Sequence, residues 1–307
     1  MPPADAEPLA PALIRALLND RPLKAAAFIV TIYGDVVEPR GGVLWMGDLI
    51  ALCAEVGISE SLVRTAVSRL VSAGQLVGEK EGRRSYYRLA PAARAEFATA
   101  SRVLFDQPGD EGWEFVHLFD EDADATMRAL ERVGYARIAP RLAVGPKRHV
   151  ETIDKALVFE AHPVSGEAEL QRFAAGYWDL PAAASAYDSF LRNFATLVAG
   201  RDAAPRPDGS KALTLRLLLV HAYRLVVLRD PRLPPAALPV AWPGEAARTL
   251  FARLYVQLSK AADRHVAEEL TAMEGPLPER TAVLDRRLAA LGRRAEQATG
   301  PAAANRV

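Results

Sequence analysis

Residues 59–74 read SESLVRTAVSRLVSAG, and much of the fold around them follows from this stretch. Its apolar and polar residues alternate at the spacing of an α-helix, which predicts an amphipathic helix over residues 60–73. Ser59 is placed to cap the first turn with its hydroxyl, and Gly74 to end the helix. The apolar stripe that should pack on neighbouring helices consists of Leu62, Val63, Ala66, Val67, Leu70 and Val71.

The opposite face of this helix is polar and carries two arginines among short hydroxyl side chains. Arginine can form two hydrogen bonds to guanine, and serine and threonine bind bases or phosphates without filling the major groove. The predicted DNA-contacting residues of this helix are Ser61, Arg64, Thr65, Ser68 and Arg69.

The flanking sequence completes a DNA-binding module. A helix begins near residue 24 and ends near residues 38–42, and a second helix covers residues 46–54. After the third helix, residues 75–79 and 84–89 predict a β-hairpin around a polar turn. Three helices followed by a hairpin are the order of a winged helix-turn-helix, and a linking helix over residues 91–103 follows. The wing adds the predicted DNA contacts Lys80, Arg83, Arg84, Tyr86 and Arg88.

Composition sets limits on the function. The 307 residues are enough for two or three domains, and the single cysteine, Cys53, rules out a disulfide within one chain. The 38 basic and 38 acidic residues leave no net charge, so DNA binding must rest on a local basic surface. The most apolar run, residues 213–228, contains Arg216, His221 and Arg224, which indicates a buried helix rather than a membrane span. We expect a cytoplasmic protein without a membrane partner.

The rest of the chain changes from mixed to helical. Strands over residues 113–118, 135–138, 141–144 and 156–161, with helices over residues 122–133 and near Val150, predict a βαββαβ ferredoxin-like unit. After it the pattern predicts helices only, over residues 167–177, 180–199, 211–228, 244–260 and 262–273. The predicted class is therefore mainly α with α+β parts.

Several segments together resemble the PaaX family, which comprises repressors of phenylacetic-acid catabolic operons. They are AAFIVTIYGD at residues 26–35, VRTAVSRL at 63–70, GRRSYY at 82–87, YWDL at 177–180, LRDPRLP at 228–234 and WPG at 242–244. The resemblance extends from about residue 20 to residue 273.

The resemblance implies a three-part architecture and a regulated repressor. The expected parts are a winged helix-turn-helix over residues 20–91, a linking helix over 92–108, a ferredoxin-like middle domain over 109–165, a helical C-terminal domain over 166–275, and a C-terminal helix and tail over 276–307. It also implies a homodimer that binds double-stranded operator DNA and is released by an acyl-CoA, typically phenylacetyl-CoA.

An acyl-CoA site needs fixed positive charge for the phosphates and an apolar, partly aromatic pocket for the acyl group. The predicted effector-binding residues are Trp178, His221, Arg224, Arg229, Asp230 and Arg232. A structural role is the alternative for each of them, because Arg229 and Asp230 can also lock a helix end and Trp178 can be part of a core.

Two other functions are conceivable: an enzyme that processes CoA esters, and a winged helix that binds proteins. The sequence contains no phosphate-binding Gly-rich loop, nucleophile elbow or zinc motif, and its five histidines lack metal-ligand spacing. We therefore expect no enzyme activity, no cofactor and no metal. The polar face of residues 60–73 also argues against a protein-binding role for that helix.

Overall fold

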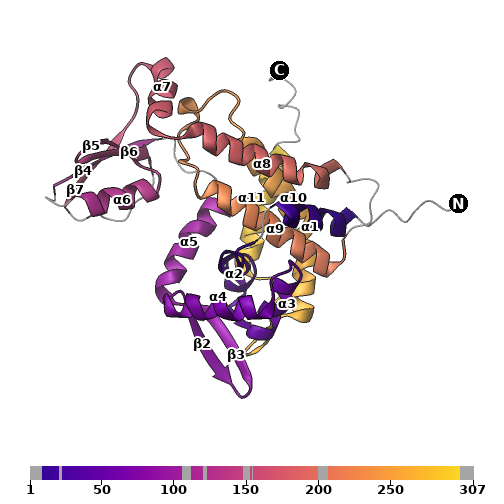
Figure 1. Ribbon diagram of the computed structural model, residues 1–307. Helices are drawn as coiled ribbons and strands as arrows, with labels where there is room; N and C mark the ends of the chain where they lie inside the picture. The colour runs from indigo at the N-terminus through magenta and orange to yellow at the C-terminus, as the bar shows by residue number, and fades with distance from the viewer. Residues whose placement is uncertain are drawn as a thin grey trace. The chain divides into compact units, whose positions relative to one another are not determined.

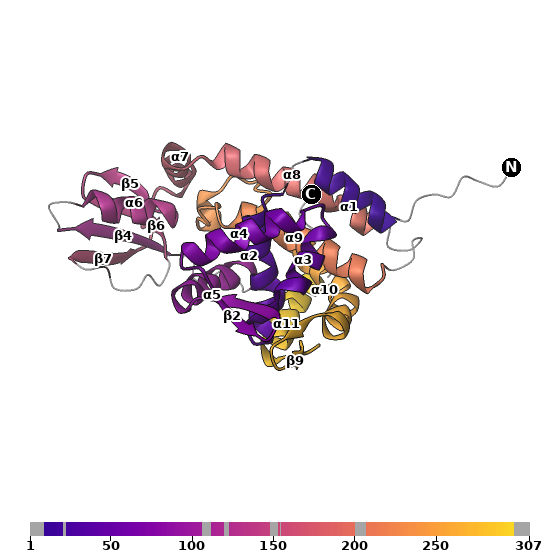
Figure 2. The same ribbon diagram turned by 60° about the horizontal axis from the view of Figure 1, so that its bottom comes forward.

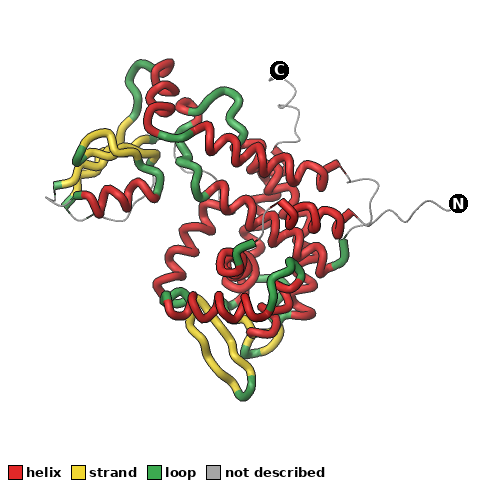
Figure 3. Tube along the Cα trace, viewed as in Figure 1, coloured by secondary structure: helices red, strands yellow, loops and turns green. Residues whose placement is uncertain are grey.

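A computed structural model describes residues 9–20, 23–105, 112–119, 123–147, 153, 155–199 and 207–297 (Figures 1 and 2). The described chain is mainly helical with short antiparallel sheets, which confirms the expected class (Figure 3). It divides into two compact units, of which the first comprises Met1–Asp106, Phe190–Arg224 and Arg248–Val307, and the second Gln107–Ser189 and Leu225–Ala247.

The first unit begins with a small sheet and the helices around it. Its first elements are α1 (Leu9–Asp20), α2 (Ala25–Ile32), β1 (Val43–Trp45), α3 (Met46–Ala54), α4 (Glu60–Ser72), β2 (Leu76–Glu81), β3 (Arg84–Leu89) and α5 (Pro91–Phe105). Strand β3 lies between β1 and β2 and is antiparallel to both. The sequence predicted the β2–β3 hairpin but missed β1 and α1, because a three-residue strand shows no periodicity and α1 lies in an Ala- and Pro-rich stretch.

Helix α4 ends one residue before the predicted Ala73, and only one of its two predicted end signals is confirmed. Gly74 adopts a left-handed φ of +68°, and the amide of Gln75 donates to the carbonyl of Leu70 at 2.9 Å, as expected for a helix-ending glycine. Ser59 occupies the N-cap position without capping the helix through its side chain. Its hydroxyl lies 3.1 Å from the hydroxyl of Ser61 instead, which leaves the first-turn amides to other partners.

The C-terminal part of the first unit is a helical layer. It contains the main part of α9 (Gly209–Val227) and of α10 (Gly244–Glu269), the short strands β8 (Thr271–Ala272) and β9 (Gly275–Pro276), and α11 (Ala282–Gln297). Helix α10 is continuous where the sequence pattern predicts two helices, and that prediction is wrong. Lys260, Ala261 and Ala262 contain no breaker, and the buried Leu258, Ala262 and Val266 keep one face apolar across the expected gap.

The second unit is built on a four-stranded antiparallel sheet in the order β5-β6-β4-β7. The strands are β4 (Trp113–Leu118), β5 (Ala136–Ala139), β6 (Leu142–Pro146) and β7 (Ala156–Ala161). Helix α6 (Asp124–Arg132) packs Met127 and Leu130 against Val116 on one side of the sheet (Figure 1). A second apolar cluster joins Trp113 of β4 to α7 (Glu167–Tyr177), the start of α8 (Leu180–Ala199) and the 3-10 helix η3 (Pro235–Ala237). The helix expected near Val150 lies outside the described residues.

Candidate nucleic-acid interface and candidate ligand pocket

Helix α4 exposes the polar face that the sequence predicted. Ser61, Arg64, Thr65, Ser68 and Arg69 are all exposed. The buried residues of α4 are Val63, Ala66, Val67 and Leu70. The helix therefore packs with one face and offers the other to solvent.

Two residues of the predicted apolar stripe do not belong to the core. Leu62 is 57% exposed and Val71 is 40% exposed. Each is next in sequence to a buried residue, and consecutive residues of a helix point about 100° apart. The buried stripe is therefore narrower than the sequence suggested.

Arg64 of α4 is oriented by a contact within the helix itself. The guanidinium of Arg64 lies 2.7 Å from the carboxylate of Glu60, one turn earlier, and more than half of each side chain is exposed. An exposed pair of this kind contributes about 0–1 kcal/mol, so a phosphate or a base can replace Glu60 at little cost. The hydroxyl of Thr65 donates to the carbonyl of Ser61 at 2.8 Å.

The β2–β3 hairpin adds a basic surface. Lys80, Arg83, Arg84 and Arg88 are exposed. The guanidinium of Arg84 lies 4.9 Å from the centre of the Trp45 ring, a cation–π contact that ties the hairpin to β1.

Tyr86 differs from its predicted role. Its side chain is only 3% exposed, and its strand position faces Trp45 of β1. We therefore do not include Tyr86 among the proposed DNA contacts, because a buried ring serves the sheet rather than a ligand.

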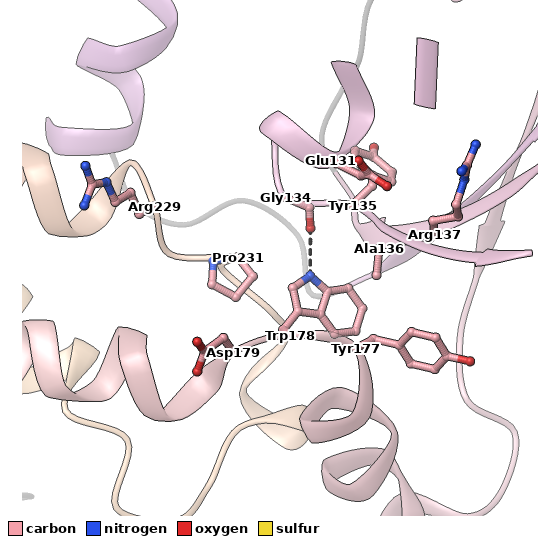
Figure 4. Close-up of a pocket in the computed structure, with 10 residues that line it drawn as sticks. All are labelled: Glu131, Gly134, Tyr135, Ala136, Arg137, Tyr177, Trp178, Asp179, Arg229 and Pro231. Atoms are coloured by element: carbon pink, nitrogen blue, oxygen red, sulfur yellow. Dashed lines mark hydrogen bonds between the residues drawn. The ribbon is translucent and has the colours of Figure 1, made fainter. Parts of the chain in front are cut away.

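The second unit contains a pocket of about 480 Å³ (Figure 4). It is lined by Glu131, Gly134, Tyr135, Ala136, Arg137, Tyr177, Trp178, Asp179, Arg229 and Pro231. Trp178 occupies the middle of this group, and its indole N–H donates to the carbonyl of Gly134 at 2.9 Å. The Trp178 ring is further held by Trp113 and Phe173, with ring centres 5.9 and 6.1 Å away.

The turn after α9 borders this pocket and is tightly bound. Asp230 is 7% exposed, and its carboxylate accepts a hydrogen bond from the hydroxyl of Tyr187 at 2.5 Å and another from the amide of Arg232 at 2.6 Å. Arg232 has a left-handed φ of +54°, which is uncommon for a residue with a side chain. Arg229 is exposed, and among the described residues no carboxylate forms an ion pair with it.

The structure brings only some of the predicted effector-binding residues together. Trp178 and Arg229 line the pocket, and Asp230 and Arg232 belong to the turn beside it. His221 and Arg224 belong to the first unit, where both contact α2. Their role in effector binding stays a prediction.

The contacts of these two residues are structural in kind. The Nδ1 atom of His221 lies 2.9 Å from the hydroxyl of Thr31, and Arg224 donates to the carbonyl of Ala27 at 3.0 Å. Burial, with the nearby charge of Arg224, lowers the pKa of His221 to about 4, so its ring is neutral at pH 7.

A buried cluster of charges in the first unit was not predicted from the sequence. We call it the charged cluster: Asp35, Arg40, Arg216, Asp263 and Arg287. Arg216 is fully buried and lies 3.0 Å from a carboxylate oxygen of Asp35 and 2.6 Å from one of Asp263. Burial disfavours the charge of Arg216, but the two carboxylates outweigh it and raise the pKa.

The charged cluster connects the N-terminal module to the C-terminal helices. Asp35 lies in a π-helix, Tyr33–Val37, that directly follows α2. Its carboxylate also accepts hydrogen bonds from Tyr255 of α10 at 2.8 Å and Arg287 of α11 at 3.2 Å. Arg40 donates to Asp263 of α10 at 2.5 Å. The sequence offered a weak signal, Arg216 within the most apolar run, but it did not identify the partners.

The described ranges contain neither a metal site nor a helix that could span a membrane. No group of three histidine, cysteine or acidic side chains is arranged to hold a metal ion there. None of the described helices combines the length and the apolar character that crossing a membrane requires.

Comparisons with known proteins point to one family. Residues 24–93 match the model of the PaaX-like protein family, and residues 178–268 match that of the PaaX-like protein C-terminal domain. The Transcriptional repressor PaaX of Escherichia coli (strain K12) is 32% identical over 285 residues, which cover 86% of this chain and 90% of that protein. Among solved structures, Uncharacterized protein Rv0674 from Mycobacterium tuberculosis is 21% identical, with a TM-score of 0.42 over 71% of this chain and 89% of that one. The two family models and the extended identity to the Escherichia coli protein show that this chain belongs to the PaaX family.

Proposed function

We propose that this protein is a DNA-binding transcriptional repressor of a phenylacetate catabolic operon. In this proposal α2 to β3 form a winged helix-turn-helix in which α4 enters the major groove and the β2–β3 hairpin contacts the backbone. The observation that carries it is the exposed Arg, Ser and Thr face of α4 beside a hairpin with four exposed cations. The name of the Escherichia coli relative, a transcriptional repressor, supports the same conclusion.

Each basic residue has a defined part in this proposal. Arg64 and Arg69 read bases, and Ser61, Thr65 and Ser68 bind bases or phosphates beside them. Lys80, Arg83, Arg84 and Arg88 bind phosphates and supply affinity that does not depend on sequence.

We further propose that two copies bind one operator as a homodimer in the cytoplasm, and that an acyl-CoA such as phenylacetyl-CoA releases them. Two-fold symmetry places two recognition helices in successive major grooves. We place the linking helix at α5, the middle domain on the β4–β7 sheet and the effector domain on the later helices, as the sequence predicted. No observation favours either alternative function. The exposed face of α4 is polar apart from Leu62 and Val71, and no group of side chains that could hold a metal ion is found among the described residues.

Fluorescence anisotropy tests the DNA-binding part. A labelled duplex from the protein's own upstream region and a random duplex of equal length are titrated at fixed salt with wild type, Arg64→Ala and Arg83→Ala. A base contact is worth about 1–3 kcal/mol, so Arg64→Ala should weaken specific binding by about 5- to 150-fold and random binding much less. Arg83→Ala should weaken both alike and reduce the salt dependence.

The matched control is Arg286→Ala, which removes an exposed cation from α11 in the same unit. It should leave both affinities unchanged. Saturation at one protein per duplex would contradict the homodimer, and equal affinity of the wild type for specific and random DNA would contradict operator recognition.

A further inference from the structure

The pocket of the second unit has an aromatic middle. Figure 4 shows Trp178 between Pro231 on one side and Tyr177 on the other. The Trp178 ring is fixed by its hydrogen bond to Gly134 and by the packing of Trp113 and Phe173, whereas Tyr177 is 46% exposed. A fixed indole beside an accessible phenol is suited to a planar, apolar ligand group, which it can contact face to edge or stacked.

One cation of the pocket is available to a ligand. Arg137 is bound to the carboxylate of Asp124, but Arg229 has no ion-pair partner among the described residues. The two arginines lie on opposite sides of Trp178 (Figure 4). The planar guanidinium of Arg229 is suited to a phosphate, which it can bind through two parallel hydrogen bonds.

The backbone that carries Arg229 is held in place by its neighbour. The buried carboxylate of Asp230 is bound by Tyr187 and by the amide of Arg232, whose left-handed φ of +54° is unfavourable for a residue with a side chain. Strain of this kind persists where surrounding contacts enforce it, and it is concentrated at ligand-binding positions. The structure thus maintains a strained turn that presents an exposed arginine at a pocket, and this arginine has no ion-pair partner in the part of the chain that the structure describes.

The acidic residues of the pocket limit the ligand further. Glu131 and Asp179 also line it, so the four charged side chains balance and the pocket gives no general attraction for anions. The carboxylate of Asp179 accepts a hydrogen bond from the amide of Ala182 at 3.1 Å, at the start of α8. A ligand that carries a phosphate gains a contact with Arg229, whereas a free aromatic acid has no phosphate to offer it.

We propose that this pocket is the effector site: Trp178 and Tyr177 contact an aromatic acyl group, and Arg229 binds a phosphate of the CoA part. The inference rests on the proposed function and adds the location and the reason for preferring a thioester to the free acid. A volume of about 480 Å³ lies within the usual range for small-molecule sites and holds the acyl end, with the nucleotide toward the rim. The turn that carries Arg229 directly follows α9 in the chain. Helix α9 also carries Arg216, His221 and Arg224, of which the last two form hydrogen bonds to α2.

Isothermal titration calorimetry tests the site with phenylacetyl-CoA, CoA and phenylacetate. Wild type is compared with Arg229→Ala and Tyr177→Ser, both of which change exposed side chains and leave the core intact. Arg229→Ala should weaken phenylacetyl-CoA and CoA by about 10-fold or more, because a charge-assisted hydrogen bond is lost. Tyr177→Ser should weaken phenylacetyl-CoA but not CoA. The matched control, Arg172→Ala, removes an exposed cation of α7 outside the pocket and should change nothing.

The possible outcomes distinguish a failure of the proposed effector site from a failure of the proposed function. If wild type binds phenylacetyl-CoA and releases DNA, yet both pocket variants bind it as tightly as Arg172→Ala does, the pocket is not the effector site and the proposed function stands. If phenylacetyl-CoA neither binds wild type nor releases it from specific DNA, the effector part of the proposed function fails together with this inference. Tight binding of free phenylacetate would overturn the preference for the thioester.

Discussion

Replacing Asp35 by asparagine tests whether the charged cluster holds the N-terminal module to the C-terminal helices. The substitution keeps the shape of the side chain and removes its charge. Asp35 is completely buried, and its carboxylate contacts Arg216 at 3.0 Å, Arg287 at 3.2 Å and the hydroxyl of Tyr255 at 2.8 Å. Without it, Arg216 and Arg40 share the carboxylate of Asp263, and Arg287 loses its ion pair with Asp35.

The cost follows from that imbalance. Breaking a buried ion pair by removing one partner costs about 3–5 kcal/mol, and Asp35→Asn removes the partner of two buried arginines at once. We therefore expect a loss of about 4–5 kcal/mol, which is a large fraction of the roughly 5–15 kcal/mol that stabilises a folded protein. A second variant, Arg216→Met, should cost less, about 3 kcal/mol, because Asp35 keeps Arg287 and Asp263 keeps Arg40.

Urea unfolding followed by circular dichroism measures the effect through the midpoint of the transition and its slope. Arg280→Met is the matched control, because Arg280 forms an ion pair with Asp285 at 2.6 Å in which its side chain is 72% exposed. That surface pair should contribute no more than about 1 kcal/mol. If Asp35→Asn and Arg280→Met shift the midpoint equally, the reasoning from burial is refuted and the charged cluster does not fasten the module.

Three further predictions concern single positions. Glu60→Gln frees Arg64 from its ion pair and removes a negative charge from the proposed DNA face. The affinity for duplex DNA, measured by anisotropy titration at low salt, should therefore rise about 2- to 5-fold. An unchanged affinity would mean that this face does not contact DNA. Gly74→Ala should lower the free energy of unfolding by about 1–2 kcal/mol, because φ at this position is +68°, although no atom obstructs a Cβ there. Gly292→Ala, in the helical interior of α11, should instead raise the melting temperature in calorimetry. A change of the same sign in both variants would contradict the conformational argument. The pKa of His221 is about 4 in the folded protein and about 6.5 in the unfolded chain, so the unfolded state binds more protons between these pH values and the free energy of unfolding should fall by about 3 kcal/mol from pH 7 to pH 4. Urea unfolding of His221→Gln and wild type at several pH values should show a smaller dependence of stability on pH in the variant. An identical dependence would show that His221 does not titrate as its burial requires.

The sequence alone located most helices and the polar face of α4. Helices α3, α7 and α8 begin and end at the predicted residues, because caps, breakers and periodicity act over a few neighbouring residues. The same local logic identified the exposed Ser61, Arg64, Thr65, Ser68 and Arg69, since helical spacing fixes which residues share a face. Local patterns did not reveal the three-residue strand β1, and they predicted a break in α10 where the apolar face continues without a breaker.

The tertiary structure decided what the regular spacing of residues in a helix or strand cannot determine. Only the fold shows that Leu62 is exposed and Tyr86 buried, because the width of a buried face depends on the partner packed against it. Only the fold assigns His221 to Thr31 and Arg216 to Asp35, which are 190 and 181 residues apart in the sequence. Only the fold shows that Trp178 and Arg229 line one pocket, and that His221 and Arg224 belong to the other unit. Periodicity along the chain therefore determines which face of an element is apolar or charged, whereas the partner of each buried charge depends on contacts between segments far apart in sequence.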